Sequence, residues 1–152
     1  MAKHIPEKVE FTNLIAIYNQ QSKQLVVENR LNPNFSGLTL PGGHVEREES
    51  FSHAAIREAK EESGLTIKDP ILKGIKDFEK DDATGRYVVL LYLATNFTGE
   101  LLSSSEGQVF WEDLDKLQNT PNGVFQLDKM LQIIFNESLS ELFYSDETTH
   151  LY

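Results

Sequence analysis

Apolar residues recur with the spacing of β-strands over much of the chain. Residues 10–18 form an apolar, β-prone run, residues 19–23 form a polar turn, and residues 24–29 form a second apolar run. Together these segments predict a hairpin. Residues 71–79 and 86–96 predict a longer hairpin, and the apolar second strand of this pair indicates that it is buried.

Two later segments have the spacing of helices. Ser50 is a suitable N-cap for a helix over residues 50–63, which contains no Gly or Pro and is followed by the stop signal Gly64. Residues 126–136 carry apolar side chains at i, i+3, i+4 and i+7, which predicts an amphipathic helix; they are Leu127, Met130, Leu131 and Ile134.

The order of these elements predicts an α/β (α+β) protein with a mixed β-sheet covered by helices on both faces. Loops are expected at residues 31–41 and 98–107, where Gly, Ser, Asn and Pro gather. A chain of 152 residues suits one domain over residues 1–152. The polar tail from Ser145 onward is predicted to be loose.

Charge and composition narrow the possible partners. The chain has 24 acidic and 14 basic residues, a net charge of −10, so it does not bind a nucleic acid polymer by neutralising phosphates with Lys and Arg. An anionic ligand would need a divalent metal to offset its charge. The chain has no Cys, no visible secretory signal, and no apolar run long enough to span a membrane. We therefore expect a cytoplasmic protein without a membrane partner.

Three carboxylates are concentrated in the first predicted helix. Glu58, Glu61 and Glu62 have i, i+3, i+4 spacing and share one face. Crowded carboxylates repel one another unless a cation lies among them, and oxygen ligands of this kind suit Mg²⁺ or Mn²⁺. The alternative is a solvated acidic face in which Arg57 and Glu61 form an i, i+4 ion pair.

The full spacing of this segment resembles the Nudix box. Gly43 is followed by five residues, Glu49, seven residues, Arg57-Glu58, and then Glu61-Glu62 and Gly64-Leu65, so the box covers residues 43–65. The chain is thus similar to the Nudix hydrolases, and within them to MutT-like nucleoside triphosphate pyrophosphohydrolases. One departure is Ala59, where a bulkier aliphatic residue is usual. The resemblance implies an α/β/α sandwich.

The resemblance also implies roles for the residues of the box. Glu58, Glu61 and Glu62 would bind Mg²⁺ or Mn²⁺, with the carbonyl of Gly42 as a further ligand. Glu58 and Glu61 would also be catalytic. Glu49 would be a supporting acid, and Arg57 would orient carboxylates through charge-assisted hydrogen bonds.

Two residues outside the box are further candidates. Glu106 lies in the loop before the short apolar run 109–111, where MutT-like relatives often carry an extra catalytic or metal-binding Glu. Arg30 ends the second predicted strand, where relatives often use a basic residue to bind substrate phosphates. The alternatives are a solvated loop acid and a surface arginine. Phe35, Tyr87 and Trp111 could stack on a base, although aromatic residues more often belong to a core.

The resemblance implies hydrolysis of a nucleoside diphosphate linked to another group. Markers of ADP-ribose and dinucleoside polyphosphate hydrolases are absent, because Lys80 and residues 81–83 occupy their places. We therefore favour a nucleoside triphosphate, cleaved to the monophosphate and pyrophosphate, and specifically an oxidised guanine nucleotide such as 8-oxo-dGTP. The alternatives are hydrolysis of ADP-ribose or a dinucleoside polyphosphate, and a catalytically silent nucleotide sensor. The oligomeric state does not follow from these residues.

Overall fold

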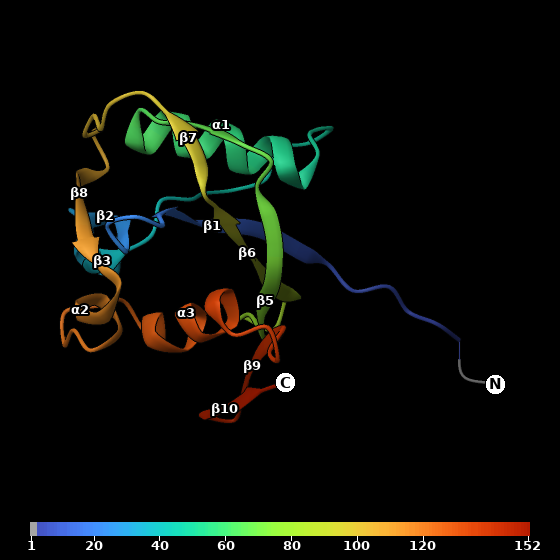
Figure 1. Cartoon of the computed structure of the whole chain (residues 1–152). Helices are drawn as coiled ribbons and strands as arrows, with labels where there is room; N and C mark the ends of the chain where they lie inside the picture. Colours follow the sequence, from blue (N-terminus) through green and yellow to red (C-terminus); the bar gives the residue numbers. More distant parts are fainter. Residues whose placement is uncertain (1–2) are drawn as a thin grey trace.

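The computed structural model describes residues 3–152 and shows a large mixed sheet between two helical layers, with a separate two-stranded sheet of β4 and β7 (Figure 1). Helix α1 covers one face, and α2 and α3 cover the other. The strands are β1 (Val9–Asn19), β2 (Gln24–Arg30), β3 (Gly37–Thr39), β4 (Thr66–Lys68), β5 (Ile71–Glu79), β6 (Arg86–Ala94), β7 (Asn96–Thr98), β8 (Gly107–Asp113), β9 (Glu141–Ser145) and β10 (Thr148–Leu151). The helices are α1 (Phe51–Ser63), α2 (Leu114–Gln118), α3 (Leu127–Phe135) and the 3₁₀ turn η1 (Pro33–Phe35).

The predicted mixed sheet is confirmed, with the order β10-β9-β5-β6-β1-β2-β3 and with β8 paired to the other edge of β2. Strand β1 runs parallel to β6 and lies at the centre of the sheet. Its alternate residues Leu14 and Ala16 face α3, whereas Ile15 and Ile17 face α1. Because both faces are covered, the strand is a continuous apolar run instead of an alternating one.

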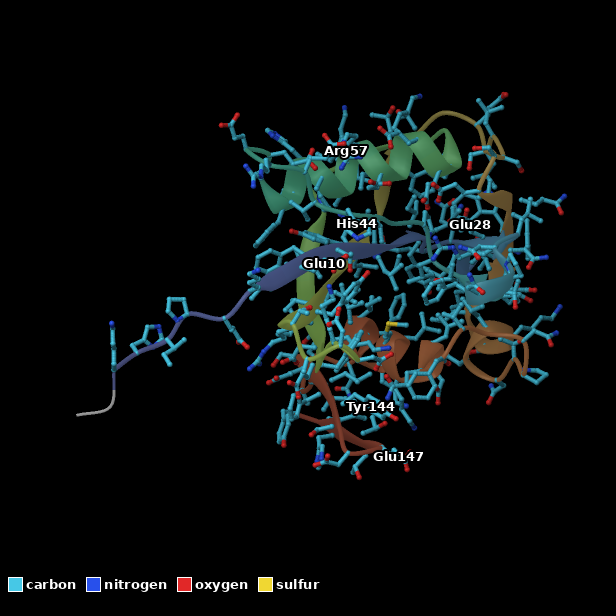
Figure 2. All side chains as sticks on the ribbon, turned by 180° about the vertical axis from the view of Figure 1, so that it is seen from behind. Glu10, Glu28, His44, Arg57, Tyr144 and Glu147 are labelled. Carbon is cyan, nitrogen blue, oxygen red and sulfur yellow. The ribbon has the colours of Figure 1, made fainter. Side chains whose placement is uncertain are left out.

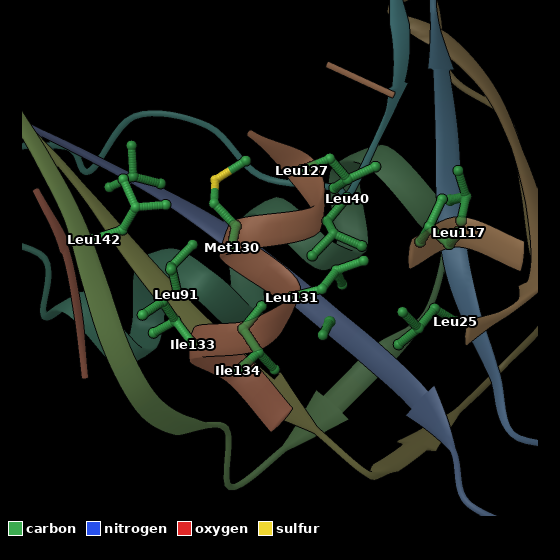
Figure 3. Packing of buried hydrophobic residues seen from close by; sticks show 13 residues of the cluster. Leu25, Leu40, Leu91, Leu117, Leu127, Met130, Leu131, Ile133, Ile134 and Leu142 are labelled. Carbon is green, nitrogen blue, oxygen red and sulfur yellow. The ribbon is translucent and has the colours of Figure 1, made fainter. Parts of the chain in front are cut away.

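Helix α3 fills the core on one face of the sheet (Figure 3). Leu127, Met130, Leu131 and Ile134 are at most 3% exposed, as their spacing predicts. They pack against strand residues that include Leu91 and Leu142.

Helix α1 begins and ends as the sequence indicates. The Ser50 side chain accepts a hydrogen bond from the His53 N–H, and Gly64 adopts a left-handed φ of 80°. Ala55 and Ala59 are fully buried against the sheet. Their small side chains let α1 lie close to β1, which accounts for Ala59 where a bulkier residue is usual.

The prediction of a loose tail from Ser145 is wrong, because β10 pairs with β9 to form a hairpin. Leu142 of β9 is fully buried, and β9 also pairs in parallel with β5. The tight turn places Asp146 and Glu147 at φ of 50° and 58°. Turns of this kind are usually signalled by Gly or Asn, so the Asp-Glu sequence concealed the hairpin.

The two segments predicted as loops are partly regular. Residues 31–41 contain η1 and the short strand β3, which pairs with β2. Of residues 98–107, Thr98 ends β7 and Gly107 begins β8, and residues 99–106 between them form a loop. Among residues 3–152, no helix combines the length and the apolar character needed to cross a membrane.

Candidate active site

Three carboxylates from separate elements converge between α1 and the sheet. Glu28 comes from β2, Glu62 from the last turn of α1, and Glu106 from the loop before β8. Each offers one oxygen, and these oxygens lie within 4.8 Å of one another. Glu28 and Glu62 are buried, whereas Glu106 is exposed. We call these residues the acid trio.

Strand register brings the acid trio together. Glu28 shares a face of β2 with Val26, which packs on the α1 side of the sheet, so its side chain faces α1 (Figure 2). Strand β8, which pairs with β2, places Gly107 opposite Arg30. Glu106 therefore lies beside the end of β2. The Leu31 N–H donates to the Glu106 carbonyl oxygen at 3.2 Å and holds the loop there.

Burial and mutual repulsion raise the pKa values of the two buried carboxyl groups of the acid trio, those of Glu28 and Glu62. Burial, and after it a hydrogen bond shared with Glu106, raises the pKa of Glu62 to about 9. Burial also raises the pKa of Glu28 above its usual range. The buried Oε1 of Glu28 has no hydrogen-bond partner among the described residues. A divalent cation would satisfy this oxygen and offset the repulsion, so the residues fit Mg²⁺ or Mn²⁺.

Arg57 of α1 (Figure 2) organises the carboxylates beside the acid trio. Its Nε and Nη2 donate to the two oxygens of Glu49 at 3.0 and 2.7 Å. Its Nη1 donates to Glu58 at 2.8 Å and to Glu61 at 3.3 Å. A further bond runs from Nη2 to the His44 carbonyl oxygen at 2.9 Å. These contacts are the geometry that the proposed orienting role requires.

The carboxylates of the Nudix box do not all occupy the same surroundings. The carboxyl group of Glu58 lies against Gly43, where an added Cβ would come within 2.5 Å of it. Glu61 is exposed and contacts Arg57. Of the three box carboxylates, only Glu62 belongs to the acid trio. Glu58 and Glu61 lie beside the trio. Their roles as metal ligands stay predictions.

Gly42 lies directly beside the acid trio. The neighbouring carbonyl groups of Pro41 and Gly43 accept hydrogen bonds from β1. The backbone N–H and carbonyl groups of Gly42 therefore point away from β1. Its N–H donates to Oε2 of Glu62 at 2.8 Å. This contact brings Gly42 to the site through its N–H, and the ligand role of its carbonyl stays a prediction.

Glu28 is the residue that the sequence did not single out. It follows the buried run Leu25–Val27 and is itself 1% exposed. An acid at a position where the strand pattern calls for an apolar residue is the signal that could have identified it.

A cleft of about 640 Å³ adjoins the site on the far side of the Gly42–Gly43 segment. Arg30 lies on its wall, 4.0 Å from Glu106, and Phe35 and Tyr87 also line it, as stacking on a base would require. Trp111 does not line it, because it packs against Phe97 in the α1-side core.

The fold and this site define a protein with a carboxylate cluster suited to a divalent cation beside an aromatic-lined cleft. A family model described as the NUDIX domain matches residues 12–132. The matched segment includes all three residues of the acid trio. The chain therefore belongs to the Nudix family of hydrolases, as the spacing of residues 43–65 indicated.

Curated relatives match parts of the chain. It is 36% identical over 93 residues to the Bacillus subtilis (strain 168) protein named "Uncharacterized Nudix hydrolase YvcI", covering 59% of each chain. It is 28% identical over 116 residues to an "ADP-ribose pyrophosphatase" of Methanocaldococcus jannaschii, covering 76% of this chain and 68% of that one. It is 38% identical over 76 residues to an "Oxidized purine nucleoside triphosphate hydrolase" of Danio rerio, covering 50% and 49%.

A solved structure shares the fold over nearly the whole chain. The MutT protein from Bacillus halodurans superposes with a TM-score of 0.75 and 22% sequence identity, covering 93% of this chain and 97% of that one. The likeness therefore extends well beyond the 23 residues of the box.

Proposed function

We propose that this Nudix hydrolase cleaves a nucleoside triphosphate to the monophosphate and pyrophosphate with Mg²⁺ or Mn²⁺. The convergence of Glu28, Glu62 and Glu106 at one end of an aromatic cleft carries the proposal. The carboxylates suit a cation that accompanies phosphates, and the cleft suits a nucleoside. A nucleotide lying across the Gly42–Gly43 segment would reach both.

The metal would be held by Glu58, Glu61, Glu62 and Glu106 with Gly42, and we add Glu28 to this set because its buried Oε1 is unpaired. When bound, a divalent cation offsets the charge of the phosphates and lowers the pKa of a water molecule that attacks phosphorus.

The remaining steps belong to side chains of the site. Water adds to one phosphorus as the bridging P–O bond breaks, and the leaving phosphate departs with the electrons of that bond. We assign Glu58 as the group that accepts the proton, because Arg57 holds its carboxylate at 2.8 Å. Glu49 supports this arrangement by binding Arg57. Arg30, which lines the wall of the cleft, would bind a phosphate oxygen.

Within the triphosphates, we propose an oxidised guanine nucleotide such as 8-oxo-dGTP. The Danio rerio relative, which is 38% identical over the matched region, is named for oxidised purine nucleoside triphosphates. The places of the ADP-ribose and dinucleoside polyphosphate markers are taken by Lys80 and residues 81–83.

ADP-ribose is the second candidate substrate. The Methanocaldococcus jannaschii relative is named for ADP-ribose and matches 76% of this chain, a larger share than the match to the Danio rerio protein. The two candidates give different products, because ADP-ribose yields AMP and ribose 5-phosphate and releases no pyrophosphate.

A hydrolysis screen tests both candidates. Purified protein is incubated with ordinary and oxidised nucleoside triphosphates, ADP-ribose and dinucleoside polyphosphates, with Mg²⁺, Mn²⁺ or EDTA, and the products are separated by chromatography. We expect metal-dependent release of pyrophosphate from a triphosphate. Glu62→Gln should lose this activity, and the matched control Glu137→Gln, at an exposed position outside the site, should keep it.

Two outcomes would contradict the proposal. Cleavage of ADP-ribose in preference to every triphosphate would assign the second substrate class. Nucleotide binding without hydrolysis under either metal would instead support a nucleotide sensor.

A further inference from the structure

A buried lysine without an acidic partner lines the cleft. Lys76 of β5 is 9% exposed, and its Nζ lies 5.5 Å from the ring centre of Phe78 and 5.3 Å from that of Phe125. Over residues 3–152, its ammonium group has no carboxylate within ion-pair distance. Burial lowers the pKa of Lys76 to about 8, with no neighbouring charge contributing to the shift. Such a cation is costly to bury unless a ligand satisfies it.

Lys76 lies several strands away, along the sheet, from the Gly42–Gly43 segment beside which the phosphates would bind. Strand register aligns Lys76 with Val89, Val89 with Thr12, and Thr12 with His44, which follows Gly43. Three strand spacings separate Lys76 from His44, a distance of about 14 Å. Lys76 is therefore too far from the acid trio to act on the scissile phosphate, and it lies where the nucleoside end of a substrate would reach.

The surroundings of Lys76 suit a planar base better than another phosphate. Phe78 and Tyr87 stack with ring centres 5.2 Å apart, and both line the cleft with Phe35 and Phe125. Aromatic walls with a few polar groups bind flat rings. A second phosphate would require several donors, and Asp81 and Asp82 on the same cleft would repel it.

The chemistry of the ammonium group selects among bases. Lysine donates three hydrogen bonds and accepts none. A carbonyl oxygen at the edge of a base is a good acceptor, whereas an exocyclic amino group presents further donors. At C6, guanine and hypoxanthine carry the carbonyl and adenine carries the amino group.

We propose that Lys76 is a specificity-determining residue that selects 6-oxopurine nucleotides over adenine nucleotides by donating to the base carbonyl. This inference rests on the proposed function for the identity of the ligand as a nucleotide. It also weighs against ADP-ribose, which carries adenine.

Inosine and adenosine triphosphates provide a matched pair of substrates, because their bases differ only at position 6 and the adjoining ring nitrogen. We expect kcat/KM to favour ITP over ATP by about 10-fold or more, since a hydrogen bond from a charged donor contributes roughly that much. Lys76→Met keeps the volume of the side chain and should reduce the ratio to about 2-fold, chiefly by raising the KM for ITP. The control is Lys73→Met on the same strand, outside the cleft, which should keep the ratio.

Binding of inosine and adenosine monophosphates, measured by calorimetry, separates this inference from the proposed hydrolysis. A preference for IMP that Lys76→Met abolishes supports the inference even if no triphosphate is cleaved. Hydrolysis of ITP and ATP at equal efficiency, or a preference that survives in Lys76→Met, overturns the inference and leaves the proposed function standing. Absence of both hydrolysis and binding preference overturns both.

Discussion

Arg57 donates two hydrogen bonds to the carboxylate of Glu49, from Nη2 at 2.7 Å and from Nε at 3.0 Å. Its third nitrogen, Nη1, donates to Glu58 at 2.8 Å. One guanidinium thus joins the loop that precedes α1 to a carboxylate on α1 itself. The fork geometry of arginine allows this, because two parallel donors fix the plane of the group.

Replacement of Arg57 by lysine tests whether this plane matters. Arg57→Lys keeps the charge but cannot reproduce the two parallel bonds. We expect kcat to fall about 10-fold or more, while the metal concentration at half-maximal activity changes little. Steady-state kinetics across a metal titration measure both quantities. Equal effects on metal affinity and kcat would show that Arg57 supports metal binding directly.

Glu28→Gln tests the carboxylate that only the structure brings to the site. We expect at least a 10-fold loss of kcat/KM and a loss of the increase in Tm that Mg²⁺ or Mn²⁺ produces, because one ligand of the cluster becomes neutral. Differential scanning calorimetry with and without metal measures this increase. Full activity and an unchanged metal response would exclude Glu28 from the metal site.

Glu106→Gln tests the exposed member of the acid trio. We expect turnover to fall by about 10²-fold, as for the loss of one positioned acid–base group. Nucleotide binding in EDTA should not change, because the cleft residues are untouched. Rapid-quench kinetics and metal-free calorimetry together decide the role. Normal turnover would make Glu106 a solvated loop acid.

Gly43→Ala tests the close approach of the box carboxylate to the backbone. The new Cβ would lie 2.5 Å from the Glu58 carboxyl group, which must move away. We expect a large loss of turnover with a smaller loss of stability, because the clash involves a side-chain end. Gly42→Ala is the contrasting variant: its Cβ would meet the Asn13 carbonyl oxygen of β1 and should impair folding itself. Urea denaturation separates the two effects.

Lys76→Met should also stabilise the fold in a pH-dependent way. The folded-state pKa of about 8 lies below the unfolded value of 10.5, so the unfolded state binds more protons between these values. Stability of the native chain therefore rises with pH through this window relative to the methionine variant. We expect the variant to be more stable by about 1–3 kcal/mol near pH 7, with the gain shrinking towards pH 10.

Urea denaturation of both chains at the two pH values measures this difference. The other ionisable groups on the cleft are present in both proteins, so their contributions cancel to a first approximation; they are Arg30, His44, Lys80, Asp81, Asp82 and Tyr87. A gain that does not change with pH would show that folding leaves the pKa of Lys76 at its unfolded value.

The sequence by itself determined the parts that depend on local spacing. The caps of α1, the apolar stripe of α3 and the turn between β5 and β6 follow from a few neighbouring residues each. The same is true of the shared surface of Glu58, Glu61 and Glu62, because residues three and four apart are neighbours on any helix. The spacing of residues 43–65 was enough to indicate the family.

Only the tertiary structure decided which distant side chains meet. Glu28 joins Glu62 because β2 turns that face towards α1, and Lys76 enters the cleft because β5, β6 and β1 pair in one register. The C-terminal hairpin likewise depends on the pairing of β9 with β5. Such contacts depend on strand register and packing between residues far apart in the chain, and a shift of one residue would turn each side chain to the opposite face.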